Sequence, residues 1–200
     1  MRFRHVILDR DGVLNEEAPG EGYLQDAEQF RWLPGALEAL ATLRRGGVRL
    51  SVATNQAGIG RGLMSLAQLE VVHARMRAEA ATEGGALDAV LVCPHAPGAG
   101  CACRKPEPGL IRAAVAAAGV SADETLVVGD ARRDLEAAVR AGVSAALVRT
   151  GKGRQTEAEI TGAGVPTYDD VLALADAVVT DRVECWHGKL PQFHEHTEYF

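Results

Sequence analysis

Basic residues are in the minority in this sequence. Lys and Arg together number 21 against 27 Asp and Glu, which gives a formal net charge of −6 at pH 7. A protein that binds a nucleic acid backbone or an anionic membrane surface needs a surplus of positive charge. We therefore expect neither a nucleic acid nor a membrane as a partner.

Long apolar runs are also missing. No stretch approaches the about 20 consecutive apolar residues that a membrane-spanning helix needs. The apolar run at residues 6–8 stops at Asp9, so it is too short for the core of a signal peptide. The sequence thus predicts a cytoplasmic protein. Because no dimerisation motif is visible, we expect a monomer.

Cysteine is scarce and unevenly placed. The chain has 4 cysteines, and three of them fall within residues 93–103 together with a histidine. A disulfide framework would spread its cysteines through the fold, whereas three thiolates and one imidazole are typical of a closed structural zinc site. The sequence predicts that Zn²⁺ is bound by Cys93, His95, Cys101 and Cys103. Because four protein ligands leave no position for water, we expect this zinc to stiffen its loop rather than take part in bond breaking.

Short apolar runs alternate with stretches of helical spacing along most of the chain. The predicted strands are 5–9, 48–54, 88–93, 125–129 and 144–149. The predicted helices are 34–45, 66–82, 108–118, 131–141 and 168–179. This alternation favours an α/β fold with a doubly wound parallel, Rossmann-like sheet in one domain at residues 1–180. Residues 181–200 show no clear period, and we expect a tail that wraps the surface or moves freely.

Carboxylates follow two of the predicted strands. Asp9 and Asp11 come at the end of the first strand, and Asp130 comes directly after the fourth. Sheets of this kind bind ligands beyond the carboxyl ends of their strands. Carboxylates this close repel one another unless a cation lies between them, and an all-oxygen ligand set suits Mg²⁺. Standing alone, the acidic pair would fit a solvated turn equally well.

Two further residues at this edge suit an anionic group. Thr54 ends the second predicted strand and offers a hydroxyl and nearby backbone N–H groups to a phosphate. Lys105 precedes a predicted helix and offers a positive charge to a phosphoryl group. Each residue alone is more often structural, so the prediction depends on their combination with the carboxylates.

The combination resembles the four motifs of the haloacid dehalogenase-like superfamily. The matching residues, in order, are Asp9-Arg10-Asp11-Gly12-Val13, Thr54, Lys105, and Gly129-Asp130 with Asp134. The resemblance implies a phosphatase in which Asp9 attacks phosphorus, while Asp11 protonates the leaving oxygen and then activates water. It also implies that Thr54 and Lys105 bind the phosphoryl oxygens. Mg²⁺ would be held by Asp9, Asp130 and the backbone carbonyl of Asp11.

The zinc loop narrows the resemblance to one branch of that superfamily. Its position ahead of Arg104-Lys105-Pro106 is similar to the branch that contains heptose-bisphosphate and histidinol-phosphate phosphatases. The segments 9–15, 54–62 and 148–153 look more like the heptose-bisphosphate enzymes, which implies removal of the 7-phosphate from D-glycero-D-manno-heptose 1,7-bisphosphate, a small sugar phosphate. Histidinol phosphate is the alternative substrate. A zinc-stabilised binding module without turnover is the alternative from another class.

The same resemblance implies a set of substrate contacts. They are Gly22, Tyr23, Thr54, Asn55, Gln56, Ala57, Arg104 and Lys105. The planar fork of Arg104 suits the phosphate that is retained. Ala131 stands where these enzymes often carry lysine, so Arg132 or Arg133 is a candidate to supply that charge. The connection between the first strand and the first helix is too short for a cap domain, and we expect an open site. We assign no chemical role to His5 or His73, which we expect to be packed or surface residues.

Overall fold

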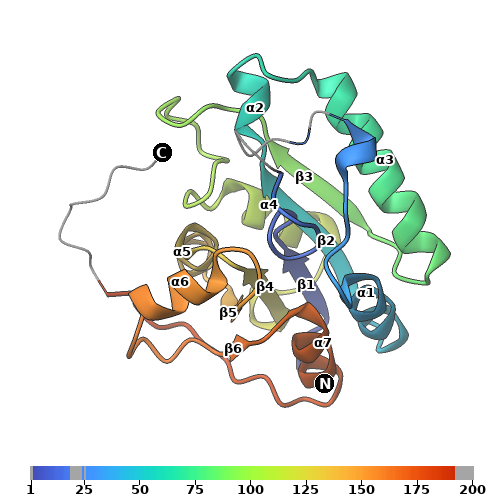
Figure 1. The fold of residues 1–200 in the computed structure, drawn as a ribbon. Helices are drawn as coiled ribbons and strands as arrows, with labels where there is room; N and C mark the ends of the chain where they lie inside the picture. The colour runs from blue at the N-terminus through green and yellow to red at the C-terminus, as the bar shows by residue number, and fades with distance from the viewer. Residues whose placement is uncertain (1, 19–23, 25, 192–200) are drawn as a thin grey trace.

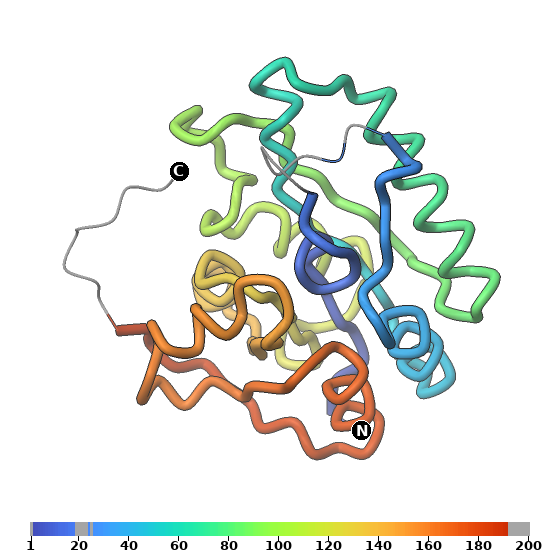
Figure 2. The backbone as a smooth tube through the Cα atoms, viewed as in Figure 1, coloured from blue at the N-terminus to red at the C-terminus, as the bar shows by residue number. Residues whose placement is uncertain are grey.

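The computed structural model describes residues 2–18, 24 and 26–191 of the protein. At its centre is a 6-stranded sheet with the order β3-β2-β1-β4-β5-β6, in which all neighbouring strands are parallel (Figure 1). Figure 2 shows the path of the backbone in the same view. The strands are β1 (His5–Leu8), β2 (Arg49–Asn55), β3 (Ala89–Cys93), β4 (Thr125–Gly129), β5 (Ser144–Val148) and β6 (Thr167–Tyr168). The predicted α/β fold with a parallel sheet is confirmed.

Helices cover both faces of the sheet. The faces are assigned by alternation along each strand, since Val6 and Leu8 pack into one hydrophobic cluster and Ile7 into another. The first cluster includes α1 (Ala36–Arg45), α3 (Leu66–Thr82) and α7 (Val171–Val179), and the second includes α4 (Gly109–Ala118) and α5 (Arg132–Ala141). Figure 1 shows α5 on the opposite side of the sheet from α1 and α3.

The sequence signals for helix ends explain most boundaries. Ser65 caps α3 by accepting a hydrogen bond from Gln68 N, and the Gln68 side chain accepts one in return from Ser65 N at 2.8 Å. Gly119 and Gly142 end α4 and α5 in the left-handed region, with φ of 63° and 74°. These signals are local, which is why the sequence placed these helices to within two residues.

One predicted helix begins too early. The structure starts α7 at Val171 rather than at residue 168, because Asp170 caps the helix by accepting from Ala173 N at 2.8 Å. The preceding Thr167 and Tyr168 form β6, which pairs with β5. Apolar spacing alone does not separate a two-residue edge strand from the first turn of a helix.

Several short elements were not predicted. They are η1 (Ala27–Gln29), α2 (Ala57–Gly60), η2 (Ala122–Glu124) and α6 (Gly153–Glu159). Of these, α2 and α6 follow β2 and β5 and therefore begin at the carboxyl edge of the sheet. Within the described ranges, the connection from β1 to α1 holds only η1 and no inserted domain. No helix in the described part of the chain has both the length and the apolar character needed to cross a bilayer.

The segment after α7 has no helix or strand in its described part, residues 181–191, yet it packs against the domain. Trp186 is only 6% exposed and belongs to the second hydrophobic cluster. Its indole Nε1 donates to the Ala163 carbonyl at 2.8 Å, and its backbone N donates to Ser144 Oγ at 2.9 Å. Residue 180 therefore marks the end of the last helix, and apolar packing continues beyond it.

Candidate active site

The carboxyl edge of the sheet gathers three carboxylates. Asp9 follows β1, Asp130 follows β4, and Asp134 lies in the first turn of α5. Each offers an oxygen within 4.8 Å of the other two, and all three residues are buried. The sequence placed Asp9 and Asp130 at this edge and Asp134 in the motif that follows Gly129, and the structure brings the oxygens of all three together.

Lys105 forms ion pairs with two of these carboxylates, Asp9 and Asp134, and its side chain is 2% exposed. Its Nζ is 3.0 Å from Asp9 Oδ1, 2.6 Å from Asp134 Oδ1 and 2.7 Å from the Ala53 carbonyl. Burial alone would lower the pKa of Lys105, but Asp134 and Asp9 raise it above its usual value. The Asn55 side chain fixes the lysine backbone by accepting from Lys105 N and donating to Lys105 O. Lys105 is thereby held as a charged ammonium group beside Asp9.

The surroundings of Asp130 suit a divalent cation. Asp130 Oδ2 accepts from Lys152 N at 2.8 Å, whereas Oδ1 is buried and has no hydrogen-bond partner. Burial, followed by the neighbouring carboxylates, raises the pKa of Asp130 to about 7, and burial raises that of Asp9 to about 6. A buried acceptor without a partner and crowded carboxylate oxygens are the features that a bound Mg²⁺ would satisfy.

Two glycines let the backbone approach Asp130 closely. A Cβ atom at Gly12 or at Gly151 would lie 2.2 Å from Asp130 Oδ2, and Gly12 has a φ of +83°. Thr150 Oγ1 also donates to the Gly12 carbonyl at 2.6 Å, so the loop after β5 holds the turn after β1. No side chain fits at either glycine without displacing the carboxylate.

Asp11 is held apart from this cluster by donors on both of its oxygens. Arg10 donates from Nη2 to Oδ1 and Oδ2, at 2.9 and 3.0 Å. Asn15 Nδ2 donates to Oδ1 at 2.9 Å, and Gln56 Nε2 donates to Oδ2 at 2.8 Å. Burial alone would raise the pKa of Asp11, but the Arg10 charge and these hydrogen bonds lower it below its usual value. The carboxylate is therefore fixed in orientation and favoured in its ionised form.

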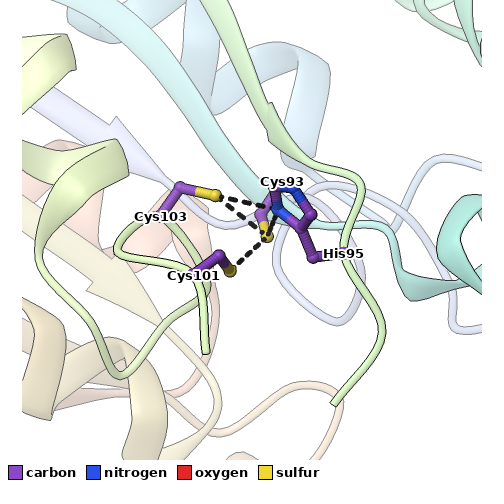
Figure 3. A group of neighbouring side chains, drawn as sticks. All are labelled: Cys93, His95, Cys101 and Cys103. Atoms are coloured by element: carbon purple, nitrogen blue, oxygen red, sulfur yellow. Dashed lines mark hydrogen bonds between the residues drawn. The ribbon is translucent and has the colours of Figure 1, made fainter. Parts of the chain in front are cut away.

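The three cysteines and the histidine that the sequence predicts as zinc ligands come together in space. Figure 3 shows the four side chains pointing toward one another from the end of β3 and the loop that follows. Cys93 Sγ is 3.7 Å from Cys101 Sγ and 3.3 Å from Cys103 Sγ, and His95 Nδ1 is 3.3 Å from Cys103 Sγ. Ligands at Zn–S bonds of about 2.3 Å in a tetrahedron are about 3.8 Å apart, so the observed separations are close to those of a zinc site. Burial raises the pKa of Cys93 to about 12, which a bound cation would reverse.

With this geometry established, comparisons with known proteins are informative. Residues 102–174 match the HAD-hydrolase-like family model. The chain is 42% identical over 178 residues to the D-glycero-beta-D-manno-heptose-1,7-bisphosphate 7-phosphatase of Pseudomonas putida, which covers 87% of this chain and 98% of that protein. The chain belongs to the heptose-bisphosphate phosphatase family.

Other members of this family extend the comparison. The D-glycero-alpha-D-manno-heptose-1,7-bisphosphate 7-phosphatase of Mycobacterium tuberculosis is 42% identical over 137 residues, covering 66% of this chain and 70% of that protein. A crystal structure of D,D-heptose 1,7-bisphosphate phosphatase from B. bronchiseptica, complexed with magnesium and phosphate, aligns with a TM-score of 0.83. It is 38% identical and covers 90% of this chain and 99% of that chain.

The predicted substrate loop of this family member is engaged largely in internal contacts. Thr54 is 1% exposed, and its Oγ1 accepts from Gln56 Nε2 at 2.8 Å. The Gln56 side chain thus bridges Thr54 and Asp11, the Asn55 side chain binds the Lys105 backbone, and Ala57 is buried at the start of α2. Gly22 and Tyr23, the other predicted contact segment, lie outside the described residues.

The two arginines that follow Ala131 have different surroundings in the structure. Arg132 is directed away from the cluster, since Nε donates to Glu136 Oε1 at 2.6 Å and Nη2 donates to the Pro191 carbonyl at 2.5 Å. Arg133 has a buried Nε without a hydrogen-bond partner. Burial alone would lower the pKa of Arg133, but carboxylates at the site raise it; these are Asp134, Asp9, Asp130 and Glu17.

Sequence reasoning missed three residues that support Asp11. Arg10 was read only as part of a motif, Asn15 only as part of a resemblance, and His73 as a packed or surface residue. Arg10 Nη1 lies 2.9 Å from His73 Nε2, and His73 is 2% exposed. One signal was available, because position 73 shares the buried stripe of α3 with Leu69, Val72, Met76 and Ala80. A histidine on such a stripe needs a polar partner.

Proposed function

We propose that the protein removes the 7-phosphate of D-glycero-D-manno-heptose 1,7-bisphosphate through an aspartyl-phosphate on Asp9. The observation that carries the proposal is the Asp9 carboxylate, which is 5% exposed and lies 3.0 Å from Lys105 Nζ in a chain of this family. Burial next to a fixed ammonium makes Asp9 a rigid nucleophile that faces the edge where sheets of this type bind ligands.

In this proposal the chain's own groups divide the chemistry. When the phosphorylated substrate is bound, the negative charge of its phosphate offsets the Arg10 charge and favours the protonated form of Asp11. An Asp9 oxygen bonds to phosphorus while the bond from phosphorus to the sugar oxygen breaks, and the protonated Asp11 gives that oxygen a proton. Water then attacks the aspartyl-phosphate and passes a proton to Asp11, which releases phosphate and restores Asp9. Lys105 and the Thr54 hydroxyl bind the phosphoryl oxygens and offset their charge.

A magnesium ion fits the carboxylate cluster, and we propose that Asp9, Asp130 and the backbone carbonyl of Asp11 hold it. The buried, partnerless Oδ1 of Asp130 supports this assignment. When bound, the ion would neutralise charge on the phosphoryl group. The magnesium in the B. bronchiseptica structure is consistent with this ligand chemistry.

We also propose that Cys93, His95, Cys101 and Cys103 hold a structural zinc ion. The loop leads directly into Arg104, whose Nη1 donates to the His95 carbonyl at 3.4 Å. A closed metal site would therefore fix the backbone that presents both Arg104 and Lys105.

We propose that Arg104 and Arg133 together bind the phosphate that the substrate keeps. Arg133 lies in the first turn of α5, where a positive charge is disfavoured by the helix dipole, and its buried Nε lacks a partner. A phosphate would offset both costs. Arg133, and not Arg132, is then the residue that supplies the charge missing at Ala131.

The remaining assignments are proposals of the same kind. We propose a cytoplasmic monomer that acts on a small sugar phosphate, with a phosphatase domain at residues 1–180 and the tail at 181–200.

The deciding test is phosphate release with Mg²⁺ from both anomers of heptose 1,7-bisphosphate and from histidinol phosphate. We expect kcat/KM for one bisphosphate anomer to exceed that for histidinol phosphate by several orders of magnitude. A preference for histidinol phosphate would contradict the proposed substrate but leave the aspartyl-phosphate mechanism unchanged. Absence of turnover with all three would favour a binding module and contradict the proposed activity.

A further inference from the structure

His73 and Arg10 form a buried polar pair behind Asp11. Arg10 is 1% exposed and is among the largest fully buried side chains of the described structure. Its Nη1 is 2.9 Å from His73 Nε2 on α3. Its Nη2 and Nε lie on the other side, against Asp11 at 2.9 to 3.3 Å. The three side chains thus form a continuous chain of contacts from α3 to the carboxylate.

The direction of each hydrogen bond follows from the chemistry of the groups. A guanidinium is always protonated and has only donors, so His73 Nε2 accepts from Arg10 and the imidazole proton is on Nδ1. His73 is therefore neutral. This agrees with burial and the Arg10 charge lowering the pKa of His73 to about 3. As a neutral acceptor, His73 restricts the orientation of the Arg10 guanidinium without adding a charge to the site.

Neutralising Asp11 does not require this arrangement. An exposed arginine would pair with the carboxylate at little cost, whereas a buried one must be desolvated and satisfied on every side. A long arginine side chain also has several rotatable bonds, and a carboxylate contact alone does not fix all of them. The His73 contact fixes the far side of the guanidinium, and so sets the plane from which Arg10 meets both oxygens of Asp11.

We propose that His73 is a positioning residue for proton transfer by Asp11. By accepting from Arg10 Nη1, it holds the guanidinium in the plane that orients the Asp11 carboxylate toward the leaving sugar oxygen. The proposal rests on the proposed phosphatase function and adds a residue on α3 to it. No bond to His73 forms or breaks, because the proton passes only from Asp11 to the leaving alcohol and later from water to Asp11.

Leaving groups distinguish positioning from simple packing. A sugar alkoxide is a poor leaving group that needs a proton as it departs, whereas 4-nitrophenolate departs without one. In a mechanism with an aspartyl-phosphate, kcat/KM reports only the steps up to release of the first product. Loss of Asp11 orientation therefore lowers kcat/KM for the sugar phosphate and leaves that for the aryl phosphate unchanged. A general loss of structure lowers both equally.

The experiment compares His73→Leu and His73→Gln with the wild-type holoenzyme. Leucine fills the site without an acceptor, while glutamine keeps an oxygen that can accept from Arg10. For His73→Leu we expect kcat/KM for heptose 1,7-bisphosphate to fall about 10- to 100-fold, and that for 4-nitrophenyl phosphate to change less than about twofold. For His73→Gln we expect recovery to within about threefold of wild type on the bisphosphate.

His5→Gln is the matched control, because His5 is also buried but lies at the amino end of β1, away from the site. It should leave the ratio of the two kcat/KM values unchanged, and melting temperatures should establish that all variants are folded. Equal losses on both substrates in His73→Leu, wild-type activity in that variant, or no recovery in His73→Gln would each overturn the proposal. The wild-type rate on heptose 1,7-bisphosphate tests the phosphatase assignment by itself, because it involves no variant. The role of His73 is tested by the variants, and recovery in His73→Gln is measured on heptose 1,7-bisphosphate.

Discussion

The cysteine cluster and the carboxylate cluster lie at the same edge of the sheet but differ in construction. The cysteine cluster comes from the end of β3 and the loop after it, residues 93–103. Its ligand atoms all lie within 4.8 Å of one another, and Cys93 Sγ is 3.3 to 3.7 Å from the other three. The carboxylate cluster draws on β1, β4 and α5 and keeps one buried oxygen without a partner. The closed cluster suits a soft ion with a structural role, and the incomplete one suits a hard ion that shares its coordination with substrate.

The largest expected effect comes from the carboxylate cluster. Asp9→Asn removes the nucleophile while keeping its size, so we expect kcat to fall at least about 10⁴-fold. Phosphate release measures the loss, and the melting temperature should stay within a few degrees of wild type. Asp123→Asn, in η2, is the control and should keep full activity. Undiminished turnover in Asp9→Asn would rule out the proposed nucleophile.

A smaller effect is expected from the cysteine cluster, because it acts on the chemistry only through the backbone that presents Arg104 and Lys105. Cys103→Ser should lose bound zinc, measured by elemental analysis of the purified protein. It should also lower kcat/KM about 10- to 100-fold, the range for residues that orient a site from outside it. Cys185→Ser, outside the cluster, should keep both zinc and activity. Full activity in a zinc-free Cys103→Ser protein would show that the two clusters are independent.

The two arginines after Ala131 sharpen the comparison further. Arg133→Gln should raise KM for the bisphosphate about tenfold with little change in kcat. A charged hydrogen bond at the lower end of its usual range, about 1.5 kcal/mol, corresponds to about this factor. Arg132→Gln should leave KM unchanged, since Arg132 is bound to Glu136 and the Pro191 carbonyl. Steady-state kinetics decide between them, and equal KM values for both variants would contradict the role assigned to Arg133.

The smallest effect concerns a region far from both clusters. His5 is buried between Ser51 and Thr125, and burial lowers its pKa from 6.5 to about 4. Because the unfolded chain takes up the proton first, this contribution to stability is complete above pH 6.5 and is lost as the pH falls toward about 4. Thermal unfolding across this range should show a declining melting temperature. His5→Gln should flatten that decline, and an unchanged slope would exclude His5 as a source of the acid sensitivity.

The contrast between the clusters also explains what the sequence could predict. Cys93, His95, Cys101 and Cys103 lie close along the chain, so their spacing alone predicted their meeting. Asp9 and Asp130 were predicted to meet because each directly follows a strand of one parallel sheet. That rule needs only the positions of the strands in the sequence, since the carboxyl ends of parallel strands lie at the same edge.

Residues that depend on side-chain direction could not be predicted in this way. The contact of His73 with Arg10 joins α3 to the turn after β1, and no local pattern encodes it. Arg132 and Arg133 are neighbours in sequence, and only the start of α5 determines which one faces the carboxylates. The helix predicted from residue 168 was wrong for a similar reason, because pairing with β5 makes Thr167 and Tyr168 a strand.

The segment after α7 ties the two layers of the fold together. Val183 packs into the cluster that contains α1 and α7, whereas Trp186, three positions later, packs into the cluster on the other face of the sheet. The two helical layers are thus joined by the segment after α7 as well as through the sheet. Separation of the two layers would have to release Val183 or the Trp186 indole as well as the sheet contacts. We therefore expect the two halves of the core to unfold in one cooperative transition.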